Sequence, residues 1–429
     1  MVLPVVTAIL AILGMLVLLL FFPKITIHGH SFSTFYLAPL LGLLILLISG
    51  ALPFDKYFSG LAKDSKMNPL EILVLFFSMT FISTVLDRLN FFSYLASRMV
   101  MKAKDSQQIL FFFLYGLCGF LTMFTSNDIV VITFTPFILF FAKDAKINPI
   151  PYLICEFVAA NTWSMLFIFG NPTNVYLASE FNIDFGGYFL HMALPTLFSA
   201  LVSLIIMYLL FRRMLKDKLD VEVSIEKIKD RPIFFVSLTI LIAVTILMAI
   251  SSYIDLPMWI FAGAGAIILI LIILISSLAK KEKPTLLLSA LKGLPFTLAP
   301  FLLSMFGIVM SLSISGASEK LVDFLNRFDQ VWSYGLSSFL FSNIMNNLPM
   351  SVLFGDLLTL GQASNQALYA VIISSNLGAI LTPIGALAGM MWMSILKEHQ
   401  INFSYAKFCL YGSIISIPTF LISILALYI

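Results

Sequence analysis

Four short polar clusters interrupt long apolar stretches of this sequence, and they contain the residue types best suited to bind a solute. They lie at 125–128, 170–174, 345–349 and 381–385, each near the middle of its apolar segment. Asn amides and Thr hydroxyls donate and accept hydrogen bonds, and Gly and Pro interrupt helices. We expect four helix breaks that enclose one polar pocket, in which helix amino ends or unwound carbonyl groups bind the solute. The alternative is that Gly and Pro only kink helices for packing.

Asp128 is the most informative residue of these clusters. No Lys or Arg occurs at 105–142, 147–211 or 328–396, so no basic side chain is available to pair with it. An unpaired carboxylate at membrane depth is costly. We therefore expect Asp128 to bind a proton or cation as the coupling residue, or to be held by amides at a helix start. In the alternative interpretation, Asp128 only caps the helix that follows it.

The composition places these clusters in a membrane. The chain has 429 residues, of which 60% are hydrophobic and 11% charged, whereas soluble domains average roughly 25% charged residues. Uncharged runs recur along the chain, each close to the roughly 20 residues that a helix needs to cross a bilayer. Backbone polar groups in lipid must bond internally, so these runs should be helical. We predict an all-α, multi-pass protein of the inner or plasma membrane.

About ten of these runs fit transmembrane helices. They lie at 3–22, 35–53, 69–86, 149–180, 186–211, 233–251, 257–278, 296–314, 367–396 and 405–428. Two further segments, 107–142 and 331–361, are too long for one straight span. If both are re-entrant hairpins, 20 of the 25 Lys and Arg residues fall on one side, whereas single crossings divide them 16 to 9. Because cytoplasmic loops are rich in Lys and Arg, we predict two hairpins and non-cytoplasmic termini.

The same topology predicts two inverted repeats. Each half then has five crossings and one hairpin, so a duplicated unit must lie upside down relative to its copy. Segment 160–170 can be laid over 375–385 without a gap. The predicted units are a first repeat at 1–212 with hairpin 107–142 and broken helix 149–180, a cytoplasmic linker at 213–232, and a second repeat at 233–429 with hairpin 331–361 and broken helix 367–396.

Other residues and functional classes have weaker support. Glu156 and Asp356 are only secondary candidates for the pocket, because both positions could reach the membrane interface instead. The four histidines do not cluster with acids at ligand spacing, so we expect no metal and no cofactor. The cysteines Cys118, Cys155 and Cys409 are interpreted as packing residues.

Three further functional classes are disfavoured. A net charge of +3 is too small for nucleic-acid binding. An intramembrane enzyme would need a nucleophile and base, metal ligands or paired acids inside the spans, and none is evident. A passive channel fits inverted hairpins less well than alternating access does.

At the polar clusters the chain resembles the arsenite and antimonite permeases of the ion transporter superfamily. That superfamily also includes citrate- and dicarboxylate-type carriers and pigment-related P proteins. The resemblance covers nearly the whole chain, and its most specific motifs are Ser126-Asn127-Asp128 with Thr135-Pro136, Ile344-Met345-Asn346-Asn347-Leu348-Pro349, and Asn376-Leu377-Gly378 with Leu381-Thr382-Pro383-Ile384-Gly385-Ala386-Leu387.

The resemblance implies an elevator-type carrier, whose hairpins and broken helices slide along a scaffold made by the other spans. It further implies efflux of uncharged arsenite or antimonite hydroxide in exchange for protons, and by analogy a homodimer. The expected solute- and ion-binding residues are Ser126, Asn127, Asp128, Asn161, Asn171, Thr173, Asn174, Asn346, Asn347, Asn376 and Thr382.

The chain departs from the family pattern in two ways. Arsenite permeases usually have Asp where this chain has Asn161 and Asn376, and small residues where it has Ile129-Val130-Val131. A sodium- or proton-coupled carrier for an organic or inorganic anion is therefore the alternative within the superfamily.

Overall fold

The computed structural model describes residues 2–22, 24–27, 30–62, 68–219, 226–251, 254 and 256–429. Within these ranges the regular structure is helical except for one antiparallel hairpin, formed by β1 (Lys24–Ile27) and β2 (His30–Ser33). The hairpin corrects the all-α prediction. It lies between two expected spans, in a stretch whose β-branched residues favour extended backbone.

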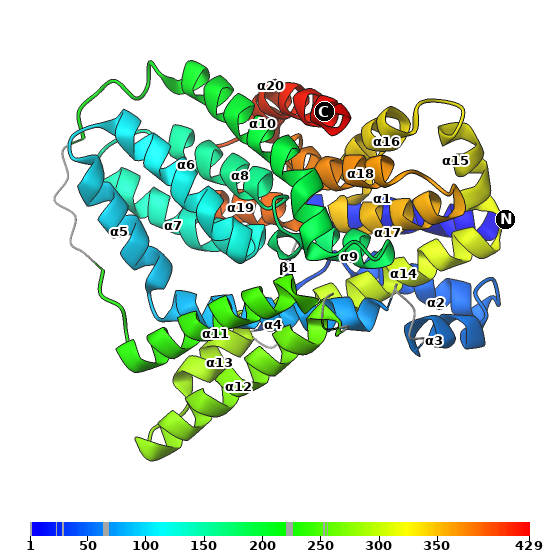
Figure 1. The fold of residues 1–429 in the computed structure, drawn as a ribbon, viewed down its shortest axis with the longest axis horizontal. Helices are drawn as coiled ribbons and strands as arrows, with labels where there is room; N and C mark the ends of the chain where they lie inside the picture. The colour runs from blue at the N-terminus through cyan, green and yellow to red at the C-terminus, as the bar shows by residue number, and fades with distance from the viewer. Residues whose placement is uncertain are drawn as a thin grey trace.

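The two halves of the chain contain the same order of helices (Figure 1). The first half comprises α1 (Val2–Phe21), α2 (Leu37–Ile48), α3 (Phe54–Ala62), α4 (Pro69–Arg88), α5 (Phe91–Ala103), α6 (Gln107–Phe124), α7 (Asn127–Asp144), α8 (Ile150–Trp163), η1 (Ile168–Gly170), α9 (Pro172–Glu180) and α10 (Phe185–Phe211). The second comprises α11 (Arg231–Ala249), α12 (Met258–Ala279), α13 (Thr285–Lys292), α14 (Leu298–Ile314), α15 (Ala317–Leu325), α16 (Gln330–Met345), α17 (Asn347–Leu360), α18 (Asn365–Leu377), η3 (Gly378–Ile380), η4 (Pro383–Gly385), α19 (Leu387–Glu398), α20 (Tyr405–Leu425) and η5 (Ala426–Tyr428).

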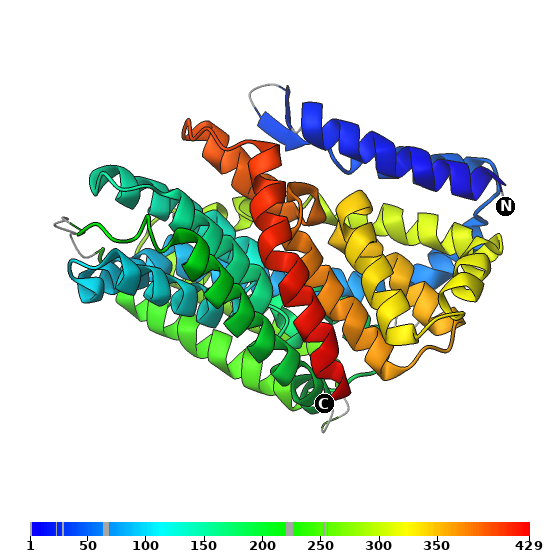
Figure 2. The same cartoon turned by 90° about the horizontal axis from the view of Figure 1, so that it is seen from above.

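Contacts between the halves are reciprocal. In each half the first hairpin arm packs on the broken helix of the same half, α6 on α8 and α16 on α18. The second arm contacts the broken helix of the opposite half, α7 on α19 and α17 on α9. Figure 1 shows α6 and α7 entering the middle of the molecule from one end and α16 and α17 from the other. The last helices of the two halves, α10 and α20, lie alongside each other (Figure 2). Two equivalent units packed around a common axis produce such a pattern.

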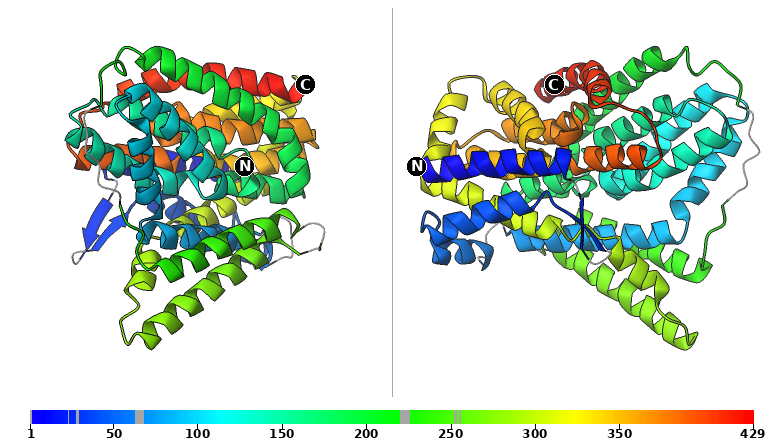
Figure 3. Two further views of the ribbon diagram at one scale, coloured as in Figure 1. Left: turned by 60° about the vertical axis from the view of Figure 1, so that its left-hand side comes forward. Right: turned by 180° about the vertical axis from the view of Figure 1, so that it is seen from behind.

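The helices that fit membrane spans differ in part from the expected ten. Among the described residues, six helices are long and apolar enough to cross a membrane, namely α4, α6, α10, α11, α12 and α20 with η5. A seventh span is possible if α14 and α15, which bend by 80°, count as one. The expected spans 149–180 and 367–396 are each divided by a break, and α2 is a shorter apolar helix. Of these helices, α11 and α12 extend farthest from the body (Figure 3).

The described ends of the chain between the halves contact the backbone close to the two ends of α5. The backbone of this segment donates hydrogen bonds from Leu219 to the Asp105 carbonyl (2.8 Å) and from Lys229 to the Leu89 carbonyl (3.0 Å). Residues 220–225 of the predicted linker lie outside the described residues. Its predicted end is two residues too late, because α11 begins at Arg231 with Asp230 as its amino cap.

A glycine lets α20 pack on the backbone exposed by the break between α18 and α19. A Cβ atom added at Gly412 would lie 2.4 Å from the carbonyl oxygen of Ile380 and 2.6 Å from that of Leu381. These carbonyls are fixed by the break, so they have little room to move. Gly116 on α6 offers a comparison, since a Cβ atom there would meet nothing within 4 Å.

We predict that Gly412→Ala destabilises the protein by about 1–3 kcal/mol, the usual cost of overpacking. Gly116→Ala is the matched control and should leave the thermal midpoint in detergent unchanged or slightly higher, because Ala is the better helix former. Equal midpoints for the two variants would contradict the packing of α20 on the break.

Candidate functional site

The four polar clusters meet at the middle of the molecule, where each precedes the start of a helix. Ser126 precedes α7, Asn171 precedes α9, Asn346 precedes α17 and Ala386 precedes α19. The two broken helices restart with matching backbone, because Asn171 has φ −148° and ψ 138°, and Ala386 has φ −148° and ψ 158°. The breaks are thus of one kind in both halves.

A small cavity of about 20 Å³ lies among these helix starts. Its lining comprises Asn127, Asp128, Asn171, Pro172, Thr173, Leu298, Asn347, Leu348, Ala386 and Leu387. Each of these residues is the amino cap or belongs to the first turn of its helix, and Leu298 is the first residue of α14. The amide-rich, partly positive ends of five helices therefore converge on one cavity.

Side-chain oxygens cap the amide of the second residue in three of the four half-helices. The Asp128 amide donates to Ser126 Oγ (3.3 Å), that of Thr173 to Asn171 Oδ1 (3.2 Å), and that of Leu348 to Asn346 Oδ1 (3.3 Å). Helix α19 has no such cap, since its amino-cap residue is alanine. The amide of its second residue, Ala388, instead lies beside the Asp128 carboxylate.

The Asp128 carboxylate therefore lies beside the start of a helix of the opposite half, while its own amide donates to Ser126 Oγ and Asn127 Oδ1. The corresponding positions of the two halves carry different residue types. Asn171 corresponds to Ala386, and Asp128 corresponds to Leu348 when the two hairpin tips are superposed at their amino caps. The helix without a local cap, α19, belongs to the second half, whereas the carboxylate beside it belongs to the first.

An amide network behind the cavity joins the two broken helices. Asn376 Oδ1 accepts from Asn171 Nδ2 (2.9 Å) and from Ser164 Oγ (2.8 Å), while Asn376 Nδ2 donates to Asn174 Oδ1 (2.7 Å). Asn376 is 0% exposed. An aspartate there could accept but not donate, so the asparagine is the residue that satisfies both sides of this contact.

Each hairpin tip is tied to the broken helix of its own half by an asparagine. Asn127 Nδ2 donates to Asn161 Oδ1 (3.1 Å), and Asn347 Nδ2 donates to the Ser375 carbonyl (3.1 Å). Asn161 in turn donates to the Phe157 carbonyl (2.8 Å). The tips and the breaks thus form one hydrogen-bonded body.

The predicted site residues fall into three groups. Asn127, Asp128, Asn171, Thr173 and Asn347 line the cavity. The residues behind it are Ser126, Asn161, Asn174, Asn346 and Asn376. Thr382 is not among the lining residues, and its hydroxyl donates to Asn343 Oδ1 (2.7 Å).

Sequence reasoning missed the apolar part of the lining and the buried hydroxyl of Ser375. Thr173 and Ser375 share a hydrogen bond of 3.0 Å between the two broken helices. The position of Ser375 beside Asn376 was the available signal. Leu298 had none, because its helix lies far from the clusters along the chain.

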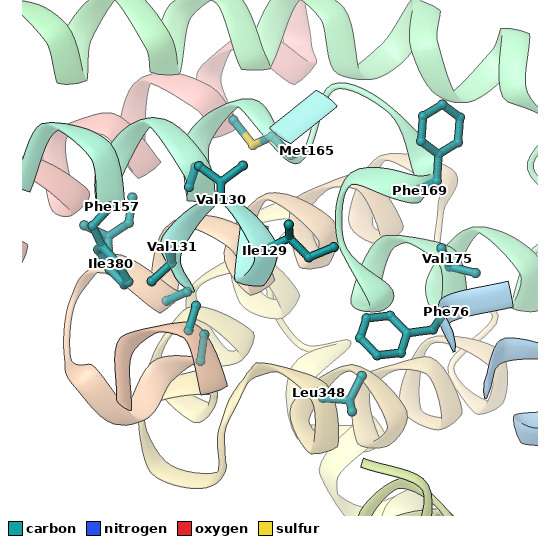
Figure 4. Close-up of a cluster of buried hydrophobic side chains, with 14 of the residues drawn as sticks. Phe76, Ile129, Val130, Val131, Phe157, Met165, Phe169, Val175, Leu348 and Ile380 are labelled. Atoms are coloured by element: carbon teal, nitrogen blue, oxygen red, sulfur yellow. The ribbon is translucent and has the colours of Figure 1, made fainter. Parts of the chain in front are cut away.

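A cluster of buried apolar side chains from both halves includes Leu348, which also lines the cavity. Figure 4 shows this cluster, with Phe76, Ile129, Val130, Val131, Phe157, Met165, Phe169, Val175, Leu348 and Ile380 labelled.

The secondary candidates lie away from the cavity. Glu156 is 0% exposed and therefore buried inside the protein. Asp356 lies beside Ser318 of α15. Among the described residues, no group of three His, Cys, Asp or Glu side chains could hold a metal ion. His28 lies outside those residues, and the three cysteines are free.

The chain matches the family model described as "Arsenical pump membrane protein" over residues 4–429. It is 25% identical over 369 residues to the "Arsenical pump membrane protein" of Escherichia coli (strain K12), covering 82% of this chain and 84% of the relative. It is also 25% identical over 378 residues to the "Putative arsenical pump membrane protein" of Bacillus subtilis (strain 168), covering 80% of this chain and 84% of the relative.

Its fold is similar to the crystal structure of the YdaH transporter from Alcanivorax borkumensis. The TM-score is 0.59 at 15% identity, covering 99% of this chain and 97% of the other. Together with the helices described above, these matches confirm the family expected from the motifs. The chain therefore belongs to the arsenical pump membrane protein family and is a multi-pass membrane transporter, not an enzyme.

Proposed function

We propose that this chain exports trivalent arsenite or antimonite, as the uncharged trihydroxide, in exchange for protons. The observation that carries the proposal is the convergence of helix amino ends around a single carboxylate, Asp128, in a chain of the arsenical pump family. Amides at helix starts donate to solute oxygens, and the side chains of Asn127, Asn171 and Asn347 can donate and accept. A trihydroxide also offers both donors and acceptors.

The charge in the cavity favours a neutral solute over an anion. Asp128 brings a negative charge among the helix starts, and no Lys or Arg occurs in the neighbouring segments to offset it. This charge would repel a solute anion at short range, whereas it would not repel an uncharged trihydroxide. This argument disfavours the anion carrier that the sequence left open.

Proton exchange follows from the chemistry of the same carboxylate. As an anion, Asp128 accepts hydrogen bonds from the Ala388 amide and from solute hydroxyls. A proton on Asp128 removes both its charge and much of this accepting capacity. Proton and solute then exclude each other from one site, which is the requirement for antiport.

We further propose inverted repeats that work as an elevator. The moving part comprises the hairpins, the broken helices, α10 and α20, and the scaffold comprises α1, α2, α4, α11, α12 and α14. Thr133 of α7 donates to Asp87 of α4 (3.1 Å), a contact that joins the two parts and must break during movement. The basic loops place both termini on the non-cytoplasmic side, and a homodimer would hold two scaffolds together.

Asp128→Asn should reduce arsenite transport driven by a pH gradient roughly 10- to 100-fold, because a hydrogen bond to a charged acceptor is worth about 1.5–3 kcal/mol. The measurement is arsenite uptake into everted vesicles with imposed proton or sodium gradients. Asp144→Asn, an exposed change at the far end of the same helix, is the matched control. Unchanged proton-driven transport in Asp128→Asn, or transport that follows only sodium, would refute proton coupling at this residue.

The proposed topology is tested with single cysteines in a background lacking Cys118, Cys155 and Cys409. Cysteines at the exposed positions Lys146 and Lys218 should react with an impermeant maleimide only from the cytoplasmic side. Cysteines at the exposed positions Lys56 and Arg327 should react only from outside. Labelling of Lys56→Cys and Lys146→Cys from the same side would rule out the inverted arrangement.

A further inference from the structure

We propose that Glu156 is a second proton-binding site, through which Asp128 exchanges protons with the basic, cytoplasmic end of the molecule. The inference rests on the proposed proton coupling and deepens it. The step is a simple acid–base equilibrium, in which the Glu156 carboxylate gains a proton to become a carboxylic acid and later releases it. No other bond changes.

Glu156 is a buried carboxyl group with few hydrogen-bond donors. It is 0% exposed, and Thr135 Oγ1 is shared between its two oxygens at 3.3 and 3.4 Å. Trp392 of α19 lies beside the same carboxyl. The indole N–H of Trp392 is buried and has no hydrogen-bond partner at standard geometry. The carboxyl is therefore under-satisfied as an anion, and an unused donor lies next to it.

Glu156 lies beside the same two helices, α7 and α19, as Asp128. Thr135 is seven residues after Asp128 on α7, and Trp392 is four residues after Ala388 on α19, so each pair lies on one helix face. The two carboxyls therefore lie along one seam between α7 and α19, roughly 10 Å apart at 1.5 Å per residue. Figure 1 shows α7, α8 and α19 running together from the middle of the molecule to the end that carries the 145–149 loop.

The other groups near Glu156 are neutral or lie at exposed helix ends. Glu156 is therefore the proton acceptor between α7 and α19. The Cys118 thiol of α6 and the Cys155 thiol of α8 lie near it, as neutral groups in a buried setting. Tyr152, one turn earlier on α8, is hydrogen-bonded to Gln107. The charged groups at the cytoplasmic ends of the packed helices are exposed, and they are Lys143, Asp144, Lys397, Glu398 and Lys407. No basic side chain on α6, α7, α8 or α19 pairs with Glu156 at membrane depth.

In the other half, the positions that correspond to Glu156 and its two neighbours are apolar. By the alignment of the two halves, Val371 corresponds to Glu156 and Leu177 to Trp392, while Gly355 corresponds to Thr135. These three positions on α9, α17 and α18 thus carry no acid, and the nearest acids on these helices, Glu180 and Asp356, lie at other positions. A carboxyl at this depth is costly without a function, and Asp128 and Glu156 lie on the same seam.

Infrared difference spectroscopy of the purified full chain tests the site without reference to transport. We expect a carbonyl band of a buried carboxylic acid that appears as pH falls and is lost in Glu156→Gln but kept in Glu180→Gln, the matched control on α9. Thr359 of α17 bonds Glu180 at the opposite end of the molecule. A Glu156 band that persists unchanged at all accessible pH values would assign a permanently neutral, structural group and overturn the proposal.

Transport then tests the role of the site. Glu156→Gln should slow proton-driven arsenite transport about tenfold or more and flatten its pH dependence, while arsenite–arsenite exchange, which moves no net proton, should persist. A wild-type pH profile in Glu156→Gln would overturn the relay. If the wild type moves no arsenite, the proposed function fails, but the infrared result still decides whether Glu156 binds a proton.

Discussion

Helix starts at membrane depth must find partners for their free amides, and this constraint organises the centre of the molecule. Backbone that is unwound in a bilayer is tolerated only where protein or a polar cavity surrounds it. Four half-helices begin around one cavity, and three of them have the amide of their second residue capped by a local side-chain oxygen. At the fourth, α19, the amide of Ala388 lies beside the carboxylate of Asp128 from the opposite half. The charge of one carboxylate is thus part of the contact between the halves.

The same constraint accounts for the asymmetry of two similar halves. Ala386 gives α19 no cap of its own, and Asn171 gives α9 a complete one. The carboxylate then occupies only one of two related places, with Leu348 in the other. The lining of the cavity therefore contains one carboxylate and not a symmetric pair.

Much of this centre could be predicted from residue types, but not its connections. The runs of apolar residues predict the helices, and Asn127, Asp128 and Asn347 were expected in the pocket they line. The sequence does not indicate that Asp128 lies beside the start of α19, because that contact depends on how α7 and α19 pack across the molecule. It also does not place Glu156 in the interior, since two turns from a helix start is compatible with either the interface or a buried seam. The β-hairpin near residue 30 was missed because only apolar periodicity was considered there.

The most direct measurement of the central claim is a cross-link between the two broken helices. The hydroxyls of Thr173 and Ser375 lie 3.0 Å apart, so Thr173→Cys with Ser375→Cys, in a background without native cysteines, should form a disulfide on mild oxidation. Trypsin cleavage within the exposed basic stretch 212–218 should then leave the halves joined until reductant is added, while either single variant separates. Halves that separate without reductant, although both cysteines are present and the protein is folded, would contradict the meeting of the two breaks at one cavity.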